Sequence, residues 1–192
     1  MADKPTTRED SGDAGARTSG GNHIATTDDP EPPAAIDESE LKPDFQTGLT
    51  ALRDRDRCQE ARPVKRRGND VLVWLGVFDL TDCTPDYDQS RAEGYFLLSE
   101  DFPQDDPHWF ITTPALTVNG RDVGDHCDRN TFRDPDQNHG DKVSLVLEVS
   151  DADTALAWSW RWSHMDLEPD DPADMSRAVL AAESALNAGG GN

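Results

Sequence analysis

The first strong hydrophobic pattern along the chain has the spacing of a helix. Within SELKPDFQTGLTALRDRDR, apolar residues recur at intervals of four, four and three. They are Leu41, Phe45, Leu49 and Leu52. One apolar face at this spacing predicts an amphipathic helix, and Pro43 suits its first turn. Gly48 weakens the helix locally, because glycine has a low intrinsic helix propensity.

Four stretches that read as β-strands follow this helix. A short polar candidate comes first, then an almost continuous apolar run that predicts a central strand buried on both faces, then two further apolar stretches. Turn residues such as Gly68 and Asn69, and proline-bounded turns, separate them. The connections are short, so we expect an antiparallel meander and an α+β fold. The stretches are 60–67, 71–80, 95–102 and 108–114.

Two later stretches also alternate between apolar and polar positions. Residues 142–151, KVSLVLEVSD, place valines and leucines at every second position, which predicts another strand. In ALAWSWRWSH the tryptophans Trp158, Trp160 and Trp162 alternate as well. A strand with one aromatic face needs a cover, and we expect the C-terminal helix to provide it.

The C-terminal helix is predicted from DPADMSRAVLAAESALN. Asp170 or Asp171 is placed to cap it, and Pro172 fits its first turn. Its apolar stripe consists of Met175, Val179, Ala182 and Leu186. We therefore expect one α+β domain over 41–188, with an N-terminal helix, a four-stranded antiparallel meander, an irregular segment and a C-terminal helix on the sheet.

The two ends of the chain lack such patterns. Residues 1–40 are rich in Gly, Pro, Ser, Thr and Asp and contain few apolar side chains. Such a segment buries too little apolar surface to offset the entropy of ordering it, which predicts a disordered acidic tail. Residues 189–192 are expected to form a short flexible tail.

The charge balance is strongly acidic. Asp and Glu total 39, Lys and Arg total 18, and the formal net charge is -21. This charge repels phosphates and anionic lipids, so neither nucleic acid nor a membrane is an expected partner. An acidic surface short of lysine is typical of halophilic archaea, where salt screens self-repulsion; a locally acidic binding surface is the alternative. Without a signal-like segment, a cytoplasmic location is expected.

Several strings resemble the ubiquitin-conjugating (UBC) superfamily. GYFLLSEDFPQDDPHWFITTPAL resembles its third and fourth strands, VNGRDVGDHC the Asn-Gly turn before its active cysteine, and WRWSHMDLEPDDPADMSRAVLAAESAL its Trp-Ser segment and following helix. A prokaryotic branch with a Trp-Ser-(Arg)-His string is the most similar. That branch is found beside genes for ubiquitin-like, activating and deubiquitinase-like proteins, which implies a role in protein conjugation.

The resemblance implies which residues would carry the chemistry. Cys127 would hold a ubiquitin-like modifier as a thioester, received from an activating enzyme. His126 adjoins it, and His164 lies in the Trp-Ser segment. The family's His-Pro-Asn tripeptide, whose Asn helps to hold the oxyanion, is replaced here by TTPALTVNG. A catalytically inactive relative that binds a ubiquitin-like partner is therefore an alternative, as is an α+β interaction module unrelated to ubiquitin.

Other readings of these residues stay open. The acidic neighbours of Cys127 disfavour a thiolate, so an ordinary loop cysteine is the alternative. Cys58 and Cys83 are expected to be structural. His126, Cys127 and His139 match no metal-site spacing, and neither a metal nor another cofactor is expected. The tryptophans form core rather than an aromatic box for a cation.

Overall fold

The computed structural model describes residues 30–105, 109–123, 131–132, 135–136, 140–159 and 171–187. Its main feature is a six-stranded antiparallel sheet in the order β1-β2-β3-β4-β8-β7. The strands are β1 (Arg62–Arg67), β2 (Asp70–Asp79), β3 (Arg91–Ser99), β4 (Trp109–Thr113), β7 (Thr131–Phe132) and β8 (Leu156–Ser159). The predicted α+β class and the four-stranded meander β1 to β4 are confirmed.

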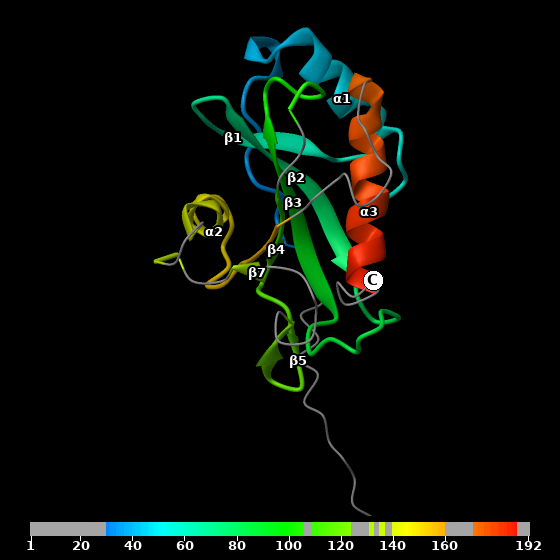
Figure 1. Cartoon of the computed structure of the whole chain (residues 1–192), viewed down its shortest axis with the longest axis vertical. Helices are drawn as coiled ribbons and strands as arrows, with labels where there is room; N and C mark the ends of the chain where they lie inside the picture. The colour runs from blue at the N-terminus through cyan, green and yellow to red at the C-terminus, as the bar shows by residue number, and fades with distance from the viewer. Residues whose placement is uncertain are drawn as a thin grey trace, which may run out of the picture.

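Helices cover both faces of this sheet (Figure 1). Helices α1 and α3 pack on one face, and α2 packs on the other. Two short 3-10 turns, η1 and η4, precede α1 and α3. A two-stranded hairpin, β5–β6, follows β4. Their bounds are η1 (Glu38–Glu40), α1 (Pro43–Arg53), β5 (Thr117–Val118), β6 (Arg121–Asp122), α2 (Gly140–Leu147), η4 (Pro172–Asp174) and α3 (Met175–Asn187).

Strand β2 is buried on both faces, as its continuous apolar run predicts. Val71, Val73 and Leu75 belong to the core under α1 and α3, which we call the α3-side core. The intervening Leu72 and Trp74 belong to a second core under α2, the α2-side core. Two helical layers around one sheet explain why this strand carries apolar residues at successive positions.

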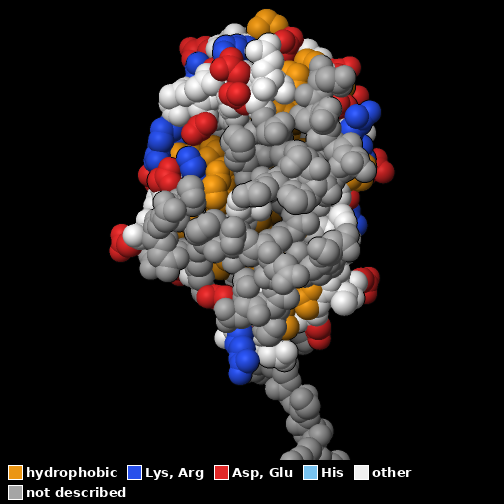
Figure 2. All heavy atoms as spheres, in the orientation of Figure 1, with side chains coloured by type: hydrophobic (Ala, Val, Ile, Leu, Met, Phe, Trp, Pro, Cys, Tyr) orange, Lys and Arg blue, Asp and Glu red, His pale blue; other side chains and the backbone are white. Residues whose placement is uncertain are grey.

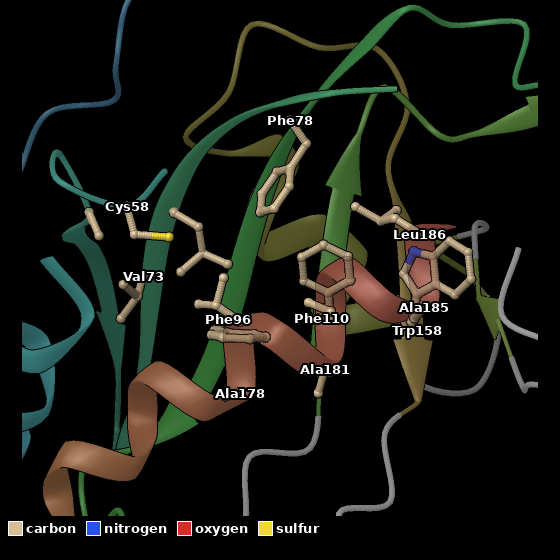
Figure 3. Packing of buried hydrophobic residues seen from close by; sticks show 14 of the residues in the cluster. Cys58, Val73, Phe78, Phe96, Phe110, Trp158, Ala178, Ala181, Ala185 and Leu186 are labelled. Carbon is tan, nitrogen blue, oxygen red and sulfur yellow. The ribbon is translucent and has the colours of Figure 1, made fainter. Parts of the chain in front are cut away.

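Aromatic rings from successive strands line the α3-side core. Phe110 of β4 makes edge-to-face contacts with Phe78 and Phe96, at centroid distances of 6.0 and 5.8 Å. Trp158 of β8 pairs with Phe110 in the register and is fully buried. Figure 3 shows its indole beside Leu186 and Ala185 of α3. The prediction that the C-terminal helix covers the tryptophan strand is confirmed for Trp158; Trp160 and Trp162 lie outside the described residues.

The strand predicted over 142–151 is wrong, because this region contains helix α2. The prediction rested on valines and leucines at every second position. Val146 stands between two of them, at a position that a half-buried strand would leave polar. Val143 and Val146 are one helical turn apart, and both are buried in the α2-side core. The Ser144 hydroxyl donates to the Gly140 carbonyl one turn earlier, at 3.1 Å. A short amphipathic segment can fit both the strand period of two and the helical period of 3.6 residues. Packing on the face of the sheet opposite α1 and α3 favours the helix.

The two terminal helices form at the predicted sites. Pro43 occupies the first turn of α1. At the other end of the chain, Asp171 caps η4 by accepting from the Ala173 N–H at 2.9 Å. The buried Glu100 carboxylate accepts from the Lys42 backbone N–H at 2.9 Å and from the Arg66 guanidinium at 2.5 Å. Glu100 thus joins the start of α1 to the sheet.

Residues 30–40 lie within the described structure, ahead of the domain boundary expected at Leu41. Ile36 donates its N–H to the Pro63 carbonyl at 2.9 Å, and its side chain packs against the α3-side core. Asp37 caps η1 through the Ser39 N–H. Residues 1–29 and 188–192, which include most of the predicted tails, are outside the described part of the chain.

Acidic and basic side chains lie next to one another at several places on the surface (Figure 2). Ion pairs join Lys42 to Asp101, Arg53 to Glu38, and both Lys65 and Arg67 to Glu148. Exposed pairs of this kind contribute little each. Among the described residues, no helix has the length and apolar character needed to cross a membrane.

Candidate functional site

The three residues predicted to carry the chemistry, Cys127, His126 and His164, lie outside the described residues. The structure describes the chain that leads to two of them. Hairpin β5–β6 ends at Asp122, and Val123 is the last described residue before the segment with His126 and Cys127. The hairpin is therefore the described part of the candidate site.

The tip of the hairpin is the Asn-Gly turn that the sequence predicts. Asn119 and Gly120 both have left-handed backbone angles, with φ of 53° and 70°. Two successive residues with positive φ make the tight turn that suits a two-residue hairpin loop. Thr117 pairs with Asp122 and Val118 with Arg121. Asparagine and glycine tolerate this backbone conformation best, which explains the dipeptide.

The carboxylate of Asp88 holds the outer side of this turn. It accepts from the N–H groups of Asn119 and Gly120 at 3.0 and 2.8 Å, and from the Thr117 hydroxyl at 2.7 Å. Asp88 also donates its own N–H to the Thr117 carbonyl at 2.9 Å. The Thr117 hydroxyl and the Gly120 N–H stabilise the charged form and lower the pKa of Asp88.

Apolar contacts hold the inner side of the hairpin. Leu116 and Val123 are fully buried in the α3-side core, and Val118 is buried nearby. Val123 also donates its N–H to the Leu116 carbonyl at 3.3 Å. The chain therefore enters the Cys127 segment from a point that is anchored on both sides.

The loop that contains Asp88 is itself tied to the end of α3. The Tyr87 hydroxyl donates to the Leu186 carbonyl at 2.8 Å, and the Cys83 thiol donates to the Asn187 side-chain oxygen at 3.2 Å. Gln89 adds two hydrogen bonds to Thr117, both at 3.0 Å. One end of the molecule thus combines the hairpin, this loop and the C-terminus of α3 into a connected unit.

Replacement of Asp88 by Asn is expected to loosen the hairpin tip. An amide has one oxygen instead of two, so it cannot accept all three hydrogen bonds. Hydrogen exchange at the Asn119 and Gly120 amides should speed up several-fold, while exchange in β2 and β3 stays unchanged. Asp86→Asn, an exposed acid in the same loop, is the control. Equal exchange rates in wild type and Asp88→Asn would contradict the proposed anchor.

The same contact predicts a pH dependence of the hairpin. The pKa of Asp88 is lower in the folded chain than the unfolded value near 3.8. Its stabilising contribution is therefore present above the unfolded pKa and is lost as the pH falls through the folded value. Acidification should lower the protection factors of these two amides, that is, their exchange rates relative to the intrinsic rates at the same pH, in wild type, and this loss of protection should be smaller in Asp88→Asn.

Two other cysteines are described, and neither is an activated thiol. Cys58 is fully buried in the α3-side core, and burial raises its pKa to about 12. Cys83 is partly exposed, and burial also raises its pKa. Both observations agree with the structural roles expected for these two residues.

Native Cys58 is expected to resist alkylation. At pH 8 a thiol with this pKa is thiolate in on the order of one molecule in ten thousand, and the thiolate is the nucleophile. Iodoacetamide followed by peptide mass spectrometry should leave Cys58 unmodified in the native chain and modify it after denaturation. Equal modification rates before and after denaturation would contradict the burial of the Cys58 thiol in the α3-side core.

Sequence reasoning found the Asn-Gly turn but missed the residues that hold it. Asp88 and Gln89 contact residues 28 to 32 positions away. No local pattern marks such partners, since acids are frequent throughout the chain. His126, Cys127 and His139, whose spacing matches no metal site, lie outside the described residues. Among the described residues, no three His, Cys, Asp or Glu side chains gather as metal ligands would.

The fold and the hairpin define an α+β protein with an antiparallel sheet between two helical layers. Comparison of the chain with protein families, curated proteins and solved structures found no match.

Proposed function

We propose that this protein is a UBC-like carrier in a prokaryotic ubiquitin-like conjugation system, with Cys127 as the thioester-forming residue. One observation carries the proposal: a helix and a four-stranded antiparallel meander lead into an anchored Asn-Gly hairpin just ahead of this cysteine. This order is similar to that of the UBC superfamily up to its active cysteine, which supports the proposal. The hairpin holds Val123, four residues ahead of Cys127, in a fixed place.

The reaction consists of two exchanges at one carbonyl carbon. The Cys127 sulfur attacks the thioester that the activating enzyme holds; a new carbon–sulfur bond forms, and the activating enzyme's thiol leaves. An amine then attacks the same carbonyl, an amide forms, and Cys127 is released as a thiol. Neither step needs an oxidant or a metal. The only protons to move are those of the entering and leaving thiols and of the amine.

His126 and His164 belong to this proposal as residues of the transfer cleft. Imidazole titrates near neutrality, so a neutral histidine can accept the proton that the attacking amine loses. His126 adjoins Cys127 in sequence, and His164 follows Ser163 in the Trp-Ser segment. Replacement of either residue should reduce the second exchange more than the first.

The test is formation of an adduct with the cognate activating enzyme, ATP and modifier. Since the composition predicts a high-salt cytoplasm, the assay is run in molar KCl. Wild type should form an adduct that a thiol reagent removes, and Cys127→Ala should form none. Cys83→Ala and Cys58→Ala are matched controls that should retain it. An adduct of the same size and thiol sensitivity in Cys127→Ala would reject the thioester role.

A second function is favoured by the chain that follows β4. Here Pro114, Ala115 and Leu116 stand in the region where the family has His-Pro-Asn, and Ala115 and Leu116 are buried. None of these three residues has a side-chain amide that could hold an oxyanion. An inactive UBC-like protein would bind a ubiquitin-like partner without forming an adduct. Capture of that partner by both wild type and Cys127→Ala, with no adduct in either, would support this function. If neither an adduct nor capture is observed, the result favours an interaction module unrelated to ubiquitin.

A further inference from the structure

A pocket of about 320 Å³ lies on the α2 side of the sheet, at the opposite face from the hairpin. Its walls come from β2, from the start of β3, from the end of β4, and from the chain that follows α2. Residues 30–33 close one side. This volume is at the small end of the range for ligand sites in proteins. The pocket therefore suits a small molecule or a single side chain.

The most unusual group in this pocket is the carboxylate of Glu93, which is only 8% exposed. Its oxygens accept three hydrogen bonds from neutral donors. Oε1 accepts from the Trp74 indole N–H at 3.0 Å, and Oε2 accepts from the Tyr95 and Thr113 hydroxyls at 3.2 and 3.0 Å. Among the described residues, no Lys or Arg forms an ion pair with Glu93. A buried carboxylate is normally paired with a cation. The three hydrogen-bond donors of Glu93 include no cation.

The three neutral donors leave acceptor capacity on Glu93. An ionised carboxylate has about four lone-pair sites, and the second site of Oε1 is not used by these contacts. Burial and the charge of Glu93 raise the pKa of Tyr95, so its hydroxyl remains protonated and keeps donating. A further donor to Oε1 would complete the coordination of the carboxylate.

A second polar group that could bind a ligand also lines the pocket. The Ser150 hydroxyl oxygen is buried and has no hydrogen-bond partner among the residues that the structure describes. Ser150 lines the pocket just after α2, where its N–H bonds back to the Val146 carbonyl. The C-terminal end of a helix carries partial negative charge, which favours a cation, and no basic residue occupies the last turn of α2. Asp151 adds a full negative charge at the adjacent position.

The whole lining combines negative charge with apolar surface. Glu31, Glu93 and Asp151 are its acids and Arg91 its base among the described residues. Val77, Ala92, Pro114 and Val149 provide the apolar surface. An inorganic ion would leave those side chains unused, whereas an alkyl chain would cover them. An ammonium group carries three donors, matching the acceptors on Glu93, Ser150 and Asp151.

We propose that this pocket binds a primary alkylammonium group, with the ammonium on Glu93, Ser150 and Asp151 and the alkyl chain against Val77 and Val149. This proposal does not depend on thioester chemistry.

The test uses n-butylammonium chloride as the probe and the full-length chain labelled with ¹⁵N at tryptophan. The Trp74 indole N–H donates to Glu93, so its resonance, assigned with Trp74→Phe, reports on the pocket. At constant total salt, n-butylammonium should shift this resonance saturably, with a dissociation constant in the millimolar range. Neutral n-butanol, which has the same number of non-hydrogen atoms, should not. Equal shifts with both compounds, or no saturable shift with n-butylammonium, would overturn the proposal.

Three variants locate the ammonium. Glu93→Gln, which keeps the size of the side chain and removes its charge, should weaken binding by about tenfold or more. Asp151→Asn, at an exposed position that folding tolerates, should weaken it several-fold, while the neighbouring exposed Asp153→Asn should not. Ser150→Ala should weaken binding without lowering the melting temperature of the free chain, because it removes a hydroxyl that forms no hydrogen bond within the described part of the chain. Unchanged affinity in all three variants would overturn the proposal.

A second probe distinguishes the source of the alkylammonium group. Nα-acetyl-lysine methylamide presents the same ammonium on a peptide-like backbone. Binding comparable to n-butylammonium would identify the ligand as a lysine side chain of a protein. Binding of n-butylammonium alone would identify a free amine. Either result supports the alkylammonium chemistry, and neither depends on whether Cys127 forms an adduct.

Discussion

Replacement of Trp158 by Ala is expected to lower the free energy of unfolding by about 3–5 kcal/mol, the usual cost of removing a large buried aromatic side chain. Trp158 is fully buried on β8, between β4 and β7 in the sheet. Its indole packs against the last turns of α3 (Figure 3). The variant would leave a cavity that a sheet and a helix cannot easily close. Because small domains are stable by only about 5–15 kcal/mol, this is a large fraction of the total.

Urea denaturation at constant salt measures this effect, and the chain offers a matched control. Leu180 lies on the same helix but is 48% exposed, so Leu180→Ala should change stability by less than about 0.5 kcal/mol. Trp158→Phe keeps part of the ring volume and should cost less than Trp158→Ala. If Trp158→Ala and Leu180→Ala had equal effects, α3 would not pack on this strand as described.

Replacement of Gly48 by Ala is expected to destabilise the protein, although alanine is the better helix former. Within α1 the exchange alone would gain about 1 kcal/mol. A Cβ at this position would lie 2.8 Å from the Pro172 carbonyl oxygen and 2.7 Å from the Met175 methyl. The methyl can move, but the carbonyl belongs to the η4 backbone. Overpacking costs about 1–3 kcal/mol, so after the gain in helix propensity a net loss of up to about 2 kcal/mol is expected.

The control for this variant is Thr50→Ala, on the exposed side of α1. It changes helix propensity without adding atoms to an interface, and it should be neutral or slightly stabilising. Thermal unfolding of both variants and of wild type gives the comparison. A Gly48→Ala protein that melts above wild type would show that α1 and η4 do not approach so closely.

Much of the fold was predictable because its signals are local. The faces of α1 and α3, the four strands of the meander and the Asp171 cap all follow from spacing over a few residues. The burial of β2 on both faces follows from its continuous apolar run. Periodicity failed for α2, where valines and leucines are dense enough to satisfy both a period of two and a helical turn.

The candidate site was predictable only in its local part. The Asn119-Gly120 turn is a signal contained in two residues. Its anchor Asp88 is not, and neither is the Glu93 pocket, whose hydrogen-bond donors come from β2, β3 and β4. Cys127, His126 and His164 remain predictions of the sequence alone.

The sequence by itself determined the positions of α1, α3 and the four meander strands, which of their faces are apolar and how acidic the chain is. Those properties depend on neighbours within one or two turns. The tertiary structure decided that Gly48 must be glycine, that residues 140–147 are helical and that Glu93 is buried among neutral donors. These depend on which backbones meet across the sheet, because close packing and the pairing of buried charge are settled by partners far apart in the chain.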